Sequence, residues 1–311
     1  MNDDFEKMKE KYGMNSKEKI RQELLTSKRE LQEYEQIILN EDYEKKDGID
    51  ILFTLEDCLR ILKEEGRMQE LLQSDENIKN DFLQYDSKLH GVSHTRRVNF
   101  FATLIMDFEN VDSKTAKLIR AFVQNHDIGR VNDYEDSEHG ANSVKILEEN
   151  IDRLALLTEE EKEKIKFMIK EHSLSNSHNE QDLDDLFTKK AQQKFNELSE
   201  EEKQGKTPDD IKEEFFSKEQ EEWKYLLDMC KDADKLDRVR LDPIGIFPSE
   251  GLDISRLSLS SSKDLENVAY ESLDKILLIL DNERELQNIE RELEELNRER
   301  GIEPEDDDGE R

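Results

Sequence analysis

The stretch AFVQNHDIGRVND, residues 121–133, places a histidine and an aspartate side by side at the end of an apolar run. Aspartate is among the residues that are least often buried without a partner. Burying a charge is unfavourable unless the charge is paired or hydrogen-bonded. Either His126 and Asp127 lie on the surface, or they hold a cation. The positions of the other histidines distinguish these two interpretations.

The composition favours a helical protein. The 311 residues include only 4 prolines and 11 glycines, and valine, isoleucine and threonine do not form the alternating runs that are typical of strands. We therefore expect an all-α fold in three parts. These are a charged helical N-terminal extension (1–85), a central domain (86–275) with a polar, helical or mobile insertion (176–221), and a charged helix with an acidic disordered tail (276–311).

The net charge and the cysteine content restrict the class of function. A net charge of −32 repels polyanions, which argues against a general nucleic-acid surface and against anionic membranes. A small phosphorylated substrate is still compatible, because metal ions and a few arginines reverse the field locally. The two cysteines are too few for a disulfide framework, the N-terminus lacks the apolar segment of a signal peptide, and no window is apolar enough to span a bilayer. These features predict a cytoplasmic protein.

Two predicted helices carry an apolar stripe that ends in a histidine. In VDSKTAKLIRAFVQNHD, capped by Asp112 or the serine after it, the stripe ends at His126. In TEEEKEKIKFMIKEHS, where Thr158 and Glu161 form a capping box, it ends at His172. A single histidine in this position is more often a hydrogen-bonded core residue than a metal ligand. The repetition of the same placement favours a common site.

Two further histidines and two carboxylates extend this pattern. His139 shares a helical face with Asn142, Ser143 and Ile146, and His94 begins a helix that Ser93 caps. In WKYLLDMCKDADKLDRVR, Asp234 and Asp237 lie on an otherwise apolar side of a helix. Carboxylates in such a position need a cation or a proton. We therefore expect histidines and carboxylates from several helices to converge on a central metal site.

The segments HTRRV, HDIGR, EHG, KEHS and DADKLDRVR, in this order, resemble the motif series of the HD-domain metal-dependent phosphohydrolases. The resemblance covers about residues 86–175 and 222–275, and it implies a helical HD-domain bundle around a metal site. Asp234 matches the family ligand better than Asp232 or Asp237, because it lies between alanine and a basic residue followed by leucine. Matched residue by residue, the four ligands of the shared metal site are His94, His126, Asp127 and Asp234.

His139 and His172 match the extra histidines of the two-metal branch of this family. The resemblance therefore implies one or two divalent metal ions, namely manganese, cobalt, nickel, magnesium or iron. That branch includes the HD-GYP cyclic dinucleotide phosphodiesterases, but the GYP motif is absent from this sequence, so a cyclic dinucleotide substrate is not supported. Arg130 stands where many relatives have lysine; its planar guanidinium binds phosphate but hardly acts as an acid.

The activity that the resemblance implies is hydrolysis of a phosphate ester in a small phosphorylated compound, with a nucleotide as the expected substrate. Divalent ions held by imidazole and carboxylate supply hydroxide near neutral pH. Asp127 and Arg130 are the expected catalytic residues, and Asp127 is able to bridge two ions. For Arg97 and Arg238 a surface salt bridge is an equal alternative. The candidates for substrate binding are Arg97, Arg130, Arg238 and His90.

Two other functions remain open at this point. Some HD-fold proteins with the richer histidine set are di-iron oxygenases. A third interpretation is a non-catalytic, metal-stabilised helical interaction domain. Residues 261–301 are typical of one long helix opened by a serine cap, and its apolar stripe would form an interface with a second copy of the chain or a partner protein, although core packing is the commoner reason for such a row. The stripe consists of Ile279, Leu286, Ile289, Leu293 and Leu296.

Overall fold

The computed structural model describes residues 16–40, 53–78, 83–85, 87, 89–134, 136–241 and 251–299. These residues form helices and turns, and none of them lies in a strand, which confirms the predicted all-α class. Among the helices in these ranges, none is both long and apolar enough to cross a membrane. The predicted acidic tail, residues 302–311, lies outside the described residues.

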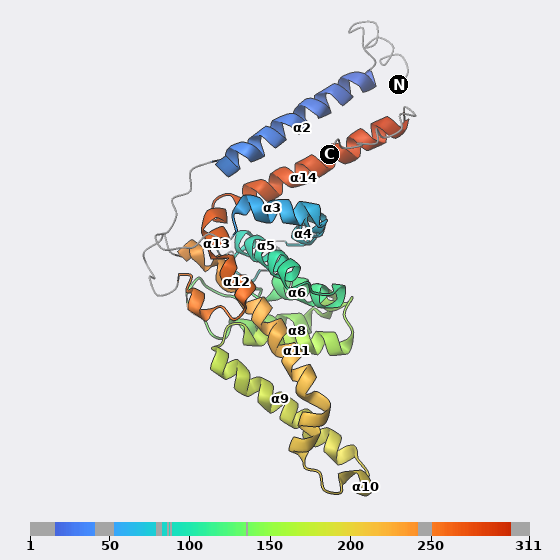
Figure 1. The fold of residues 1–311 in the computed structure, drawn as a ribbon, viewed down its shortest axis with the longest axis vertical. Helices are drawn as coiled ribbons and strands as arrows, with labels where there is room; N and C mark the ends of the chain where they lie inside the picture. Colours follow the sequence, from blue (N-terminus) through green and yellow to red (C-terminus); the bar gives the residue numbers. More distant parts are fainter. Residues whose placement is uncertain are drawn as a thin grey trace. The chain divides into compact units, whose positions relative to one another are not determined.

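The contacts divide the chain into two units, one made of residues 1–44 and 274–311 and the other of residues 45–273. In the larger unit, α11 packs against α5, α6, α8 and α9, and the α5 side chains of Phe100, Phe101 and Leu104 are fully buried. The helices of this unit, shown in Figure 1, are α3 (Leu55–Glu64), α4 (Arg67–Asp75), α5 (Val92–Phe108), α6 (Ser113–Asn125), α7 (His139–Glu149), η2 (Ile151–Leu154), α8 (Glu159–Glu171), α9 (Asn176–Glu197), α10 (Glu200–Lys203), α11 (Pro208–Leu236), η3 (Asp237–Leu241), η4 (Ile254–Arg256), α12 (Ser260–Asp264) and α13 (Glu266–Ser272).

The two helices α3 and α4 belong to the larger unit, although their residues fall within the predicted N-terminal extension. Both pack against α5, and α3 also contacts α13. The backbone N–H of Leu55 donates to the carboxylate of Glu271 at 2.8 Å. The division of contacts near residue 44 therefore differs from the predicted boundary at residue 85.

The polar insertion is helical and has its own small core. It comprises α9, α10 and the first half of α11, and α11 begins at a capping box of Thr207 and Asp210. Phe187 of α9 and Trp223 of α11 are buried, with ring centroids 5.6 Å apart. Because α11 continues without a break from the insertion to Asp234, the insertion supports the helix that carries this predicted ligand.

The prediction of one long helix over residues 261–301 is wrong. The chain forms α12, α13 and α14 (Ile276–Glu299) instead. The buried carboxylate of Asp232 on α11 accepts the backbone N–H groups of Ser258 and Leu259, each at 2.9 Å, and so holds the chain just before α12. At the end of α13, the hydroxyl of Ser272 donates to the carbonyl of Ala269, a local bond that competes with helix continuation.

The smaller unit pairs α2 (Ser16–Asn40) with α14. Leu286, Ile289 and Leu293 of the predicted apolar stripe are buried, and Lys28 forms an ion pair with Glu290 at 2.7 Å. The stripe therefore packs within the chain, as the core-packing interpretation expects.

Candidate metal centre

Local sequence rules place two of the histidines at helix ends. The helix α6 begins at Asp112, whose carboxylate accepts the N–H of Thr115 at 2.7 Å, and it ends at His126. The helix α8 begins at the predicted capping box and ends at His172. Both histidines occupy the C-cap position and are buried. The predicted stripes that end in histidine are confirmed.

The start of α5 differs from the prediction. The helix begins at Val92 with Gly91 as the N-cap, not at His94 with Ser93 as the cap. The carbonyl of Gly91 accepts the N–H of Thr95 at 3.1 Å. A Cβ at Gly91 would lie only 2.3 Å from the carbonyl oxygen of Ser87, so this tight turn requires glycine and fixes the helix start.

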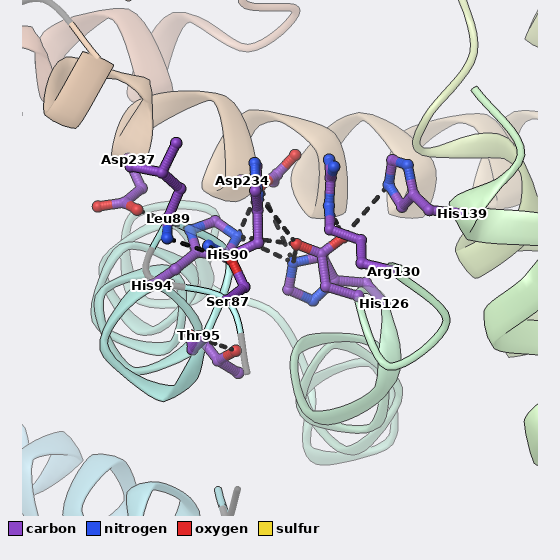
Figure 2. Close-up of polar contacts among 12 residues, drawn as sticks. Ser87, Leu89, His90, His94, Thr95, His126, Arg130, His139, Asp234 and Asp237 are labelled. Carbon is purple, nitrogen blue, oxygen red and sulfur yellow. Dashed lines mark hydrogen bonds and ion pairs between the residues drawn. The ribbon is translucent and has the colours of Figure 1, made fainter. Parts of the chain in front are cut away.

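One half of the centre contains the four ligands of the predicted shared site, of which Figure 2 labels His94, His126 and Asp234. The Nε2 of His94 lies 3.2 Å from the Nε2 of His126, 3.2 Å from an oxygen of Asp234 and 3.4 Å from Oδ2 of Asp127. Metal–ligand bonds of about 2.1 Å place neighbouring ligand atoms roughly 3 Å apart. The spacing therefore suits ligands that share one ion.

The other half contains His139, from the start of α7, and His172. Their Nε2 atoms lie 2.9 Å apart. The Oδ1 of Asp127 lies 3.2 Å from His139 and 3.6 Å from His172. Since Oδ2 faces the first pair of histidines and Oδ1 the second, the carboxylate of Asp127 lies between the two halves.

Hydrogen bonds at Nδ1 orient all four imidazoles. The Nδ1 of His126 donates to the carbonyl of Val123 at 3.0 Å, and the Nδ1 of His172 donates to that of Ile169 at 2.6 Å. His139 makes the same kind of bond to the carbonyl of Asp136. Carbonyl oxygens only accept, so each of these neutral rings turns an unprotonated Nε2 towards the centre. Facing lone pairs repel each other, and a cation between them removes that repulsion, so the donor set fits a metal.

The remaining imidazole, that of His94, donates from Nδ1 to the carboxylate of Asp237 at 2.6 Å. Ligand histidines are commonly oriented by such a carboxylate. Burial and the nearby Arg240 disfavour the charged ring, but hydrogen bonds to Asp127, Asp234 and Asp237 outweigh both and raise the pKa of His94 to about 9. In the metal-free chain, a proton on His94 therefore takes the place of a cation.

The other groups of the centre have the protonation states that a divalent ion requires. Burial lowers the pKa of His126 to about 4 and also lowers that of His139 and His172, so these rings are neutral near pH 7. Burial alone would raise the pKa of the Asp127 carboxyl, but His126 and Arg130 hold it well below its usual value. The pKa of Asp234 is likewise held well below its usual value, because the neighbouring histidines outweigh burial.

The predicted substrate-binding residues are distributed unequally around the centre. The Nε of Arg130 lies 3.1 Å from Oδ1 of Asp127, and the Nδ1 of His90 lies 3.4 Å from Oδ2. Arg97 instead forms a largely buried ion pair with both oxygens of Asp237, and Arg238 is half-buried in η3. Arg130 and His90 therefore border the metal centre directly.

Two residues complete the surroundings of the centre: Asp237, which was expected to need a cation or a proton, and Arg240, which was not assigned a role from the sequence. Asp237 orients His94, and Arg240 donates to the Nδ1 of His90 at 3.1 Å and pairs with Asp237 at 3.1 Å. The signal for Arg240 is its spacing of three residues from Asp237, which places both side chains on one face of a helical turn. Arg238 follows Asp237 directly and so points elsewhere.

The described residues thus contain buried groups of histidine and aspartate that are suited to hold a metal ion. The chain matches no protein-family model, no curated protein and no solved structure. The resemblance to the HD-domain phosphohydrolases therefore stays a prediction that rests on the motif residues.

Proposed function

We propose that this protein is a metal-dependent phosphohydrolase that cleaves a phosphate ester of a small phosphorylated compound, with a nucleotide as the first candidate. The observation that carries the proposal is the carboxylate of Asp127, whose two oxygens face different histidine pairs, His94 with His126 and His139 with His172. A shared carboxylate of this kind suits two ions a few ångströms apart, an arrangement found in many enzymes that cleave phosphate esters.

The chemistry divides between the ions and the chain. Bound divalent ions would activate water as a nucleophile near neutral pH and offset the charge of the phosphoryl oxygens. Asp127 holds the two halves together, and Arg130 places a guanidinium beside it at 3.1 Å. A guanidinium is suited to donate two hydrogen bonds to a phosphoryl group. Burial lowers the pKa of His90 to about 4, so this ring is neutral and adds a polar group beside the carboxylate.

The exposure of these side chains indicates the side from which a substrate would reach the ions. The side chain of Asp234 is 28% exposed, while that of His94 is fully buried. The side chains of Arg130 and His90 retain 13% and 12% exposure. The more exposed groups are thus a ligand and the two candidate substrate-binding residues, which favours substrate entry beside them.

A di-iron oxygenase is the second candidate. The same mixture of imidazole and carboxylate donors binds iron as well as manganese, cobalt or nickel. The observation in its favour is the presence of four imidazoles around one carboxylate. Iron bound in the purified protein, together with oxygen consumption in the presence of an organic substrate, would favour this candidate over hydrolysis.

The experiment combines metal content with turnover in untagged protein. We expect two ions per chain and hydrolysis of a member of a phosphate-ester panel in the presence of manganese, cobalt or nickel. Asp127→Ala removes the shared ligand, so both metal and turnover are expected to fall together. Asp185→Ala, at an exposed position on α9, is the matched control and keeps both. Full turnover in Asp127→Ala, or a wild-type chain that takes up no divalent ion, would refute the proposal.

A further inference from the structure

A second feature of the larger unit is a cavity of about 830 Å³ that lies among α4, α6 and η2. Its volume is in the range that small-molecule sites occupy, about 300–1,000 Å³. The candidate metal ligands are not among its lining residues. Asn125 lines it, whereas the next residue, His126, belongs to the metal centre, so the end of α6 contributes different residues to the two sites.

The lining of this cavity is rich in basic side chains, in contrast to the acidic chain as a whole. Among the described residues, its charged lining consists of four basic side chains and two carboxylates, Glu70 and Asp152. Two of these bases also pair with carboxylates outside the lining: Arg67 lies 3.5 Å from Asp107, and Lys117 lies 3.4 Å from Glu161. The charges around the cavity are therefore close to balanced, whereas the chain as a whole carries a net charge of −32. The basic residues are Arg67, Lys117, Arg120 and Arg153.

Arg120 has a buried donor without an acceptor. Its Nη2 donates to Glu70 at 3.1 Å, but within the described part of the chain no hydrogen-bond partner lies near its buried Nη1. An unpaired buried donor is energetically unfavourable. Burial lowers the pKa of Arg120, and repulsion from Arg67 lowers it further although Glu70 opposes the shift. Arg120 also lines the cavity, so an anion bound there would give the unpaired Nη1 an acceptor once the side chain turned this atom towards the cavity.

Arg153 adds a second guanidinium whose position is fixed. Its Nε donates to the side-chain oxygen of Asn125 at 2.8 Å, and its Nη2 donates to the carbonyl of Gln124 at 3.4 Å. These two acceptors belong to the last turn of α6, so Arg153 is held against the same helix that carries Arg120. Apolar side chains, including Leu154 of η2, complete the lining.

We infer that this cavity is a second binding site, specific for a small organic phosphate. Arg120 and Arg153 would hold the phosphate group through charge-assisted hydrogen bonds, and Ala116, Ala121 and Leu154 would contact the apolar body of the ligand. The site is separate from the proposed hydrolase centre, so it holds its ligand without cleaving it.

The test uses 1-naphthylphosphonate, which combines an aromatic body with a phosphonate group and has no ester bond to cleave. The probe is titrated calorimetrically into the full chain and into Asp127→Ala, in which binding through the metal centre is disrupted. We expect the Asp127→Ala chain to bind the probe, and to bind the neutral 1-naphthylmethanol at least about tenfold more weakly, because the latter lacks charge-assisted hydrogen bonds.

Variants in the Asp127→Ala chain assign the binding to the cavity. Arg120→Gln and Arg153→Gln are each expected to lower the affinity for 1-naphthylphosphonate at least about tenfold. The matched control is Arg60→Gln, an exposed arginine on α3 that pairs with Asp57 and is expected to leave binding unchanged. Circular dichroism establishes whether each variant is folded. If Arg120→Gln does not fold, the binding measured for Arg153→Gln decides the question.

Two outcomes would overturn the inference. One is a folded Asp127→Ala chain that does not bind the phosphonate. The other is binding that the folded arginine variants leave at the strength of the control. Neither outcome depends on turnover, so a failure here is distinguishable from a failure of the proposed hydrolase activity.

Discussion

Replacing Gly140 with alanine should remove one of the two ions that we propose for the candidate metal centre and leave the other. Gly140 follows His139 at the start of α7, where α7 closely approaches α8. A Cβ at this position would lie 2.5 Å from the carbonyl oxygen of Ile169 and 2.7 Å from that of Lys170. The carbonyl of Ile169 is also the acceptor that orients His172. The added methyl group would therefore press on the backbone that positions this histidine.

The size of the effect follows from these distances. An ordinary van der Waals contact to the added Cβ begins at 3.4 Å, and the carbonyl oxygen of Ile169 would lie at 2.5 Å. The helices α7 and α8 must therefore separate by roughly 0.9 Å, and such overpacking destabilises the folded state. The Nε2 atoms of His139 and His172, now 2.9 Å apart, would then move beyond the spacing of ligands that share an ion. Misplaced ligand geometry typically lowers metal affinity about 10–100-fold. We also expect a loss of about 1–3 kcal/mol in the free energy of unfolding.

The first half of the centre should be retained, because its histidines and Asp234 come from α5, α6 and α11. Metal analysis after dialysis should therefore give two ions for the wild type and one for Gly140→Ala. Gly205→Ala is the matched control: Gly205 has a φ of +77° with nothing within 4 Å of its added Cβ, so it loses stability through backbone strain alone and keeps both ions. Two ions bound to Gly140→Ala with wild-type affinity would refute the reasoning.

Three further variants test individual contacts. Asp237→Asn weakens the 2.6 Å contact that orients His94, so calorimetry should show metal affinity about 10–100-fold lower; unchanged affinity would show that the contact is not needed. Burial lowers the pKa of Lys231 to about 8, below the value of about 10.4 in an unfolded chain, so the folded state holds the ammonium less readily than the unfolded state does. As the pH rises from about 7 to about 9.5, the free energy of unfolding of the wild type, measured in urea, should therefore increase by about 2 kcal/mol relative to that of Lys231→Met. A difference in unfolding free energy between the two chains that does not change with pH would contradict this. Asp112→Ala removes the 2.7 Å cap of α6 and should lower the unfolding free energy by about 1 kcal/mol, whereas an unchanged urea midpoint would show that the cap contributes nothing.

Features that depend on neighbouring residues could be predicted from the sequence. The caps of α6 and α8 and the histidines that end their apolar stripes follow from helical periodicity and short-range hydrogen bonds. The choice of Asp234 over Asp232 and Asp237 came from the family resemblance instead. The structure places Asp234 3.2 Å from Nε2 of His94 and Asp237 2.6 Å from its Nδ1, and Asp234 as a metal ligand stays a prediction. Local chemistry was sufficient for the caps and the stripes because each helix defines its own faces.

Features that depend on distant residues could not be predicted in this way. The apolar spacing continues through residues 261–299, but the break before α14 depends on packing and on local bonds that periodicity does not encode. The membership of α3 in the larger unit depends on a contact between Leu55 and Glu271, which are far apart in the sequence. The role of Arg240 rather than Arg238 similarly depends on the direction in which η3 leaves α11.

In the proposed two-ion centre, the position of Asp127 between the two histidine pairs would make metal loading a coupled process. One carboxylate has a single orientation at a time, so the first ion to bind would fix this side chain and neutralise part of its charge before the second ion arrives. The affinity of each half then depends on the occupancy of the other, and by thermodynamic reciprocity the coupling is the same in both directions. At limiting metal, the population would therefore pass through a half-loaded form whose abundance depends on this coupling, and the active fraction would not be proportional to total bound metal.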